Sequence, residues 1–239
     1  MFKALSIALA FAIASPAFAQ QTKPDFSLID PAWAVKETDR GFQNGQSKVA
    51  WKALKRNFPA DYQAFVVEYA NATLKHEEHA PIARRFIQDH TLGALALARK
   101  APAPQLARMQ RSRAKLIQYL ATSDVAACAV MAKGGDLSSF DPTRDPLATA
   151  LFYENLATFA DAAGAGRDRP TSRTPLDAED VARLKALIVR QGGTAPEADA
   201  IFSPDAIAGD NAQSCRYGVM FYKAMAAAPD ETAARFAIR

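Results

Sequence analysis

Residues 58–73 read FPADYQAFVVEYANAT, and this stretch decides the fold class. Its large side chains recur three or four positions apart, at Phe58, Tyr62, Phe65, Val66 and Tyr69. That spacing places them on one face of an α-helix. Pro59 takes the first turn, where a missing backbone N–H costs nothing. The stretch therefore predicts a helix with one buried aromatic face.

The same period recurs further along the chain. Apolar stripes spaced by three and four residues fall within 106–120, 181–188 and 215–225. Prolines and paired glycines separate the stripes, and no long run alternates apolar with polar residues as a half-buried strand would. We expect an all-α fold, an irregular bundle of about eight to ten helices with one disulfide.

The first residues predict export. A positive start at Lys3 is followed by an uncharged apolar run over residues 4–15, and Ala17-Phe18-Ala19 is typical of a signal-peptide cleavage site. The run is shorter than the roughly 20 residues that a spanning helix needs. We expect residues 1–19 to be a signal peptide cleaved after Ala19, and residues 20–239 to be periplasmic or secreted, without stable membrane insertion.

The net charge limits the classes of partner that the chain is expected to bind. Removing residues 1–19 takes away one cation and leaves 28 Lys and Arg against 25 Asp and Glu, a net charge of +3. So mild an excess, in an exported chain, argues against nucleic acid as a partner. Arg167, Arg169 and Arg173 lie close together in a predicted loop, where an anionic envelope polymer is one conceivable partner.

The two cysteines, Cys128 and Cys215, predict a disulfide, because an even number of cysteines in an oxidising compartment favours pairing. Residues 163–175, rich in Gly, Arg, Ser, Thr and Pro, read as a loop that could separate a smaller C-terminal helical subunit. Since Cys128 precedes this loop and Cys215 follows it, a disulfide would join the two parts. We therefore expect residues 20–239 to form a single helical domain.

Histidines suggest one candidate site. His76 and His79 are three residues apart in KHEEH (75–79), so a continuous helix would carry both on one face as weak candidates for metal ligands. The spacing is one residue short of the zinc-protease pattern, no third ligand is evident, and we expect no cofactor. We expect His79 to lie at a solvated helix end, and His76, which continues the face of residues 58–73, to be partly buried.

Arg113 suggests a second site. It falls in the middle of the apolar stripe of residues 106–120, and a guanidinium inside a core needs a partner. Glu154 and Asn155 lie on or beside the apolar face of a later predicted helix. We expect a buried polar cluster that joins Arg113 to Glu154 or Asn155 and acts as a structural lock, with a ligand pocket as the alternative.

For function, the sequence shows no nucleophile elbow, no phosphate-binding glycine loop and no Cys–His nucleophile arrangement. The leading hypothesis is a non-catalytic envelope protein that binds another protein. The alternatives are a metal- or small-ligand-binding protein or hydrolase centred on His76 and His79, and a binder of anionic polymer. An exposed tryptophan at Trp33 or Trp51 would suit a protein partner, although we expect both to pack against the bundle.

Overall fold

The computed structural model describes residues 30–237 except 136, 138–139, 143–144, 175 and 204–208, and it leaves out the side chains of 80, 84 and 87–93. Within this part the chain forms eleven α-helices and no β-strand. The predicted all-α fold is thus confirmed, with one helix more than expected. The predicted signal peptide, residues 1–19, lies outside the described residues. Every helix that is described is too short or too polar to span a bilayer.

Short connections join most of the helices. In chain order the helices are α1 (Pro31–Asn44), α2 (Lys48–Asn57), α3 (Pro59–Leu74), α4 (His79–Ala98), α5 (Ala103–Ser123), α6 (Val125–Ala132), α7 (Pro146–Asp168), α8 (Ala178–Arg190), α9 (Ala195–Ile201), α10 (Asn211–Ala227) and α11 (Asp230–Ala237). Longer connections precede α7, α8 and α10. Five of them begin behind an aspartate whose carboxylate accepts a first-turn backbone N–H. These caps are Asp30, Asp124, Asp145, Asp177 and Asp210.

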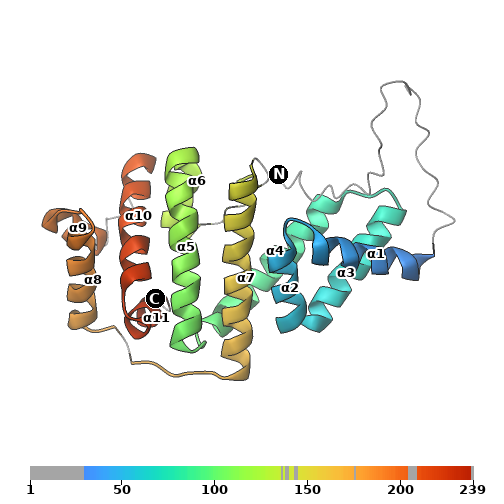
Figure 1. Ribbon diagram of the computed structural model, residues 1–239, viewed down its shortest axis with the longest axis horizontal. Coiled ribbons are helices and arrows are strands. Elements are labelled where there is room, and N and C mark those ends of the chain that lie inside the picture. Colours follow the sequence, from blue (N-terminus) through green and yellow to red (C-terminus); the bar gives the residue numbers. More distant parts are fainter. Residues whose placement is uncertain are drawn as a thin grey trace.

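Three long helices form the middle of the molecule. In Figure 1, α10, α5 and α7 stand side by side, with α8 and α9 beyond α10 and with α1, α2 and α3 beyond α7. Both α2 and α4 pack against α7. The central helix α5 is therefore covered on several sides, and only a narrow row of its side chains reaches solvent.

Residues 58–73 form the N-cap and most of α3, and their predicted face is buried. Trp51 of α2 stacks on Phe65 of α3 with ring centroids 5.1 Å apart. Phe42 of α1 and Phe86 of α4 stack on the same two rings, with centroids 4.6 Å from Trp51 and 4.4 Å from Phe65. Four helices thus converge on one aromatic cluster, which fixes the arrangement of the N-terminal third of the chain.

The boundary of the predicted loop is wrong. We expected a loop over 163–175, but α7 continues to Asp168. The glycines in this segment serve close packing: a Cβ on Gly164 would lie 2.2 Å from Asn57 Oδ1, and one on Gly166 would lie 1.9 Å from the Leu97 carbonyl oxygen. Small residues let α2 and α4 approach α7, so glycine here marks a helix contact and not a chain break.

The predicted disulfide is present. Cys128 of α6 and Cys215 of α10 are bonded, with their Cα atoms 5.1 Å apart. Gly218 on α10 supports the same contact, because an added Cβ there would lie 2.4 Å from the Ala132 side chain. The bond joins parts of the chain that are 87 residues apart in sequence, and it holds α10 against α6 and its neighbour α5.

Candidate functional site

The histidine pair is not brought together as one helix face. Helix α3 ends at Leu74, and His76 adopts a left-handed backbone conformation with φ 57°, so α4 begins separately at His79. His76, which we expected to be partly buried, is exposed. His79 lies at a helix end as expected, but it is half-buried and not solvated. The helical period breaks at the turn between them, and extrapolation from α3 therefore fails. No group of three His, Cys, Asp or Glu side chains suited to a metal occurs among the described residues.

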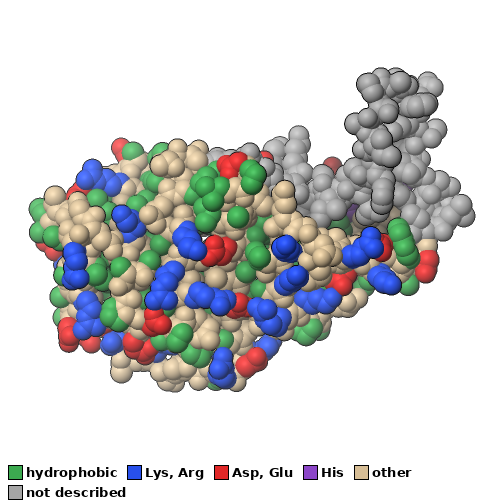
Figure 2. Space-filling view, viewed as in Figure 1, with side chains coloured by type: hydrophobic (Ala, Val, Ile, Leu, Met, Phe, Trp, Pro, Cys, Tyr) green, Lys and Arg blue, Asp and Glu red, His purple; other side chains and the backbone are tan. Residues whose placement is uncertain are grey.

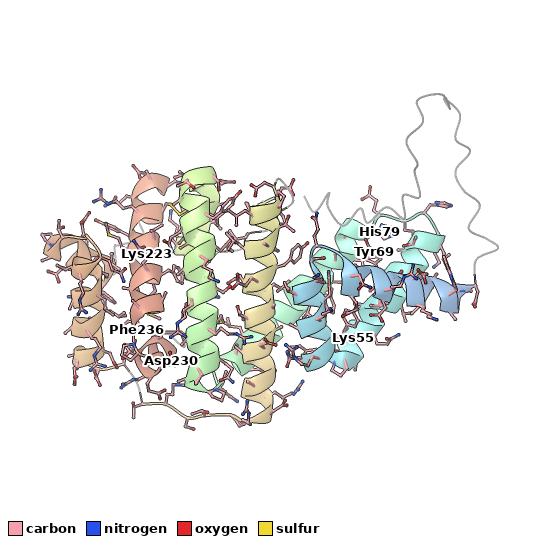
Figure 3. All side chains as sticks on the ribbon, in the orientation of Figure 1. Lys55, Tyr69, His79, Lys223, Asp230 and Phe236 are labelled. Carbon is pink, nitrogen blue, oxygen red and sulfur yellow. A yellow bond between two sulfur atoms is a disulfide. The ribbon has the colours of Figure 1, made fainter. Side chains whose placement is uncertain are left out.

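His79 instead joins the start of α4 to the end of α3. Its ring stacks on Tyr69 with centroids 4.3 Å apart, and its Nε2 lies 2.8 Å from Thr73 Oγ1. Figure 3 labels His79 and Tyr69 next to each other. The Thr73 hydroxyl donates its hydrogen to the Tyr69 carbonyl, so His79 Nε2 acts as the donor to Thr73. Burial lowers the pKa of His79 and raises the pKa of Tyr69 to about 12. The neutral imidazole is therefore a structural contact between two helices.

The predicted cluster around Arg113 does not assemble as expected. Glu154 pairs with Lys115, its carboxylate 2.8 Å from the ammonium nitrogen. Asn155 has a buried Oδ1 without a hydrogen-bond partner among the described residues, and no bond joins it or Glu154 to Arg113 in this part of the chain. Arg113 itself is half-buried. Helical spacing placed these residues near the right faces, but it could not predict which cation of α5 pairs with Glu154.

The three arginines of the predicted anionic-polymer loop have different environments. Arg167 belongs to α7, pairs with Asp168, and lies over the ring of Phe58. Arg169 is exposed in the loop. The Arg173 side chain is only 1% exposed and donates to the Ala101 carbonyl oxygen. Since Arg173 is buried and Arg167 is engaged, Arg169 is the one member that stands clear of these contacts.

The surface formed by α1 and α2 carries a concentrated net positive charge. We call it the α1–α2 face and define it by the exposed charged and large apolar side chains of these two helices. They are Trp33, Lys36, Arg40, Lys48, Val49, Lys52, Lys55 and Arg56. Residues 31–57 contain six Lys or Arg and two acidic residues, a net charge of +4, which equals the formal net charge of the whole chain. In Figure 2, Lys and Arg side chains lie over α1 and α2, and others continue across the visible face over α5 and α10.

The two tryptophans have opposite environments. Trp51 is fully buried, and its Nε1–H donates to Ser47 Oγ at 2.8 Å. Trp33 is 45% exposed, and it shares the solvent side of α1 with Lys36 and Arg40, at positions i, i+3 and i+7. This spacing identifies the solvent-exposed side of α1 only when it is known that the opposite side, with Ala34 and Phe42, is buried.

The comparisons add no relative: no known protein family, no curated protein and no solved structure matches this chain. The fold and the surface define it as an all-α, disulfide-containing protein with a cationic two-helix face.

Proposed function

We propose that this chain is an exported, non-catalytic protein that acts by binding another protein, and that the α1–α2 face is its contact surface. The observation that carries the proposal is the exposure of Trp33 beside Lys36 and Arg40. Tryptophan and arginine are the side chains most enriched among residues that dominate protein–protein affinity. A tryptophan left at the surface, while the other tryptophan is fully buried, suits an anchor for a partner.

Export is part of the proposal. The Cys128–Cys215 bond supports it, because disulfides persist in the periplasm and outside the cell and are rare in the cytosol. Mass spectrometry of the protein recovered from the periplasm or the medium tests this part. We expect a mature N-terminus at Gln20, and a chain that retains Met1 in the cytosol would contradict it.

The geometry supports protein binding better than the two alternatives. A metal or hydrolytic site at His76 and His79 would need both imidazoles at one point, whereas His79 hydrogen-bonds Thr73 and His76 lies in a separate turn. A polymer site in the loop would need Arg173 at the surface, whereas its side chain is buried.

Site-specific photo-crosslinking tests the binding proposal. A photoreactive phenylalanine analogue replaces Trp33 in the full chain, expressed in the organism that encodes it. The control places the same analogue at Val189, which is 44% exposed on α8. We expect a discrete protein adduct from position 33 and none of the same mass from position 189. No adduct at position 33, or the same adducts at both positions, would contradict the proposal.

A further inference from the structure

We infer that the partner contacts the α1–α2 face through an acidic surface of a folded protein. This inference rests on the proposed function and adds the chemistry of the partner. Its first support is the concentration of charge: residues 31–57 carry a net charge of +4, whereas residues 20–239, the proposed mature chain, carry +3, so the rest of that chain has a net charge of −1. An acidic surface would be steered toward this end of the molecule.

The second support is the orientation of the ion pairs in this face. In each of three pairs the cation is the more exposed member: Arg40 over Glu37 (68% against 16%), Lys55 over Asp39 (47% against 30%) and Arg56 over Asp161 (62% against 18%). The carboxylates lie beneath the cations and hold them in place, so the outer surface presents positive groups.

Three further cations have no carboxylate partner among the described residues. They are Lys36, Lys48 and Lys52, and all three are exposed. The face therefore combines cations that are already positioned with cations that are free to pair. Positioned charges lose less side-chain freedom on binding, which favours a partner with carboxylates in a matching fixed pattern.

The same helices offer little to a lipid bilayer. Their large apolar side chains, such as Phe42, Trp51 and Leu54, are buried in the aromatic cluster and its surroundings. Trp33 and Val49 are the only large apolar side chains of α1 and α2 that are exposed. A helix that binds at a membrane surface needs an apolar face to insert. An acidic protein surface, with apolar contacts for Trp33 and Val49, fits this face better.

A charge-reversal experiment with a matched control tests the inference. The face variant carries Lys36→Glu, Lys48→Glu and Lys52→Glu. The control variant carries Lys75→Glu, Lys100→Glu and Arg190→Glu, which change the net charge equally at exposed positions outside the face. Both are made in the full chain with the photoreactive analogue at Val49. Circular dichroism and thermal unfolding of both variants verify that they fold.

We expect the position-49 adduct to disappear in the face variant and to persist in the control, with its crosslinked peptide in an acidic segment of the captured protein. With that protein purified, we expect the face variant to raise Kd at least about tenfold and the control variant to change it little. An adduct that persists in the face variant would overturn the acidic partner and leave the proposed function standing. No adduct at position 33 or 49 would overturn both.

Flotation with vesicles of phosphatidylcholine and phosphatidylglycerol in equal parts distinguishes lipid binding from protein binding. Flotation of the wild-type chain and the control variant, but not of the face variant, would assign the face to anionic lipid headgroups and overturn the inference. We expect all three chains to remain unbound.

Discussion

Gly166 of α7 lies directly against Leu97 of α4: a Cβ on Gly166 would be 1.9 Å from the Leu97 carbonyl oxygen. Backbone atoms on both sides of this contact cannot rotate away as a flexible side chain can. The crossing of α4 and α7 therefore depends on the absence of a side chain at one position.

Gly166→Ala should lower the free energy of unfolding by about 1–3 kcal/mol, because the added methyl forces the two helices apart. Urea denaturation followed by circular dichroism measures the change. Val189→Ala, on the exposed side of α8, is the control and should stay within about 0.5 kcal/mol of the wild type. Equal stability of Gly166→Ala and the wild type would show that the contact relaxes.

Removing the disulfide should be costly. In a Cys128→Ala, Cys215→Ala double variant we expect a loss of about 2–5 kcal/mol, since the bond closes a long loop that the unfolded chain otherwise explores freely. Guanidinium denaturation with and without reductant gives the measurement. Reductant should destabilise the wild type and leave the double variant unaffected; a wild type indifferent to full reduction would contradict the expected contribution.

His79 should make stability depend on pH. Burial lowers its pKa in the folded state, so below the unfolded value of about 6.5 the unfolded chain binds a proton that the folded chain excludes. The free energy of unfolding should fall as pH drops from about 6.5 to the lowered pKa, and this contribution is fully present above pH 6.5. Urea titrations at pH 7.5 and 5.5 should show a smaller fall for His79→Gln than for the wild type.

His76→Gln is the matched control for this titration, since it removes an exposed imidazole and leaves the contacts of His79 with Tyr69 and Thr73 in place. It should keep the wild-type response. If His79→Gln and His76→Gln respond alike, the contact between α3 and α4 does not carry the pH dependence.

Arg173 and Arg169 should differ sharply although both lie in the same loop. Arg173→Ala removes a buried side chain that donates to the Ala101 carbonyl, and we expect a loss of about 1–3 kcal/mol. Arg169→Ala should stay within about 0.5 kcal/mol of the wild type. Thermal and urea unfolding of both variants provide the test. If Arg173→Ala were as stable as the wild type, the side chain would not be needed for folding, and the polymer-binding loop would again be a candidate site.

Arg113→Met should leave stability unchanged or raise it. No bond joins Arg113 to Glu154 or Asn155 in the described part of the chain, so a methionine replaces a half-buried cation with an apolar side chain of similar length. Denaturation midpoints of Arg113→Met and of Lys115→Met, which breaks an exposed ion pair, allow the comparison. If Arg113→Met, but not Lys115→Met, lowered the free energy of unfolding by more than about 1 kcal/mol, Arg113 would act as the structural lock that we first expected.

The sequence alone determined the features that depend on residues close together in the chain. The three-and-four spacing of Tyr62, Phe65 and Tyr69 fixed a helix and its buried face, because side chains one turn apart share a side. The aspartate before α8, at position 177, marks a helix start through a bond that spans only three residues. The pairing of Cys128 with Cys215 followed from their number and the predicted compartment.

Only the tertiary structure decided which of these faces meet. Gly164 and Gly166 resemble loop residues until α2 and α4 are seen against α7, and Trp33 and Trp51 resemble each other until one is covered and one is not. Arg56 pairs with Asp161, which lies more than one hundred positions away in the sequence. Burial and ion pairing depend on contacts between distant segments, and helical periodicity carries no information about which helix lies opposite.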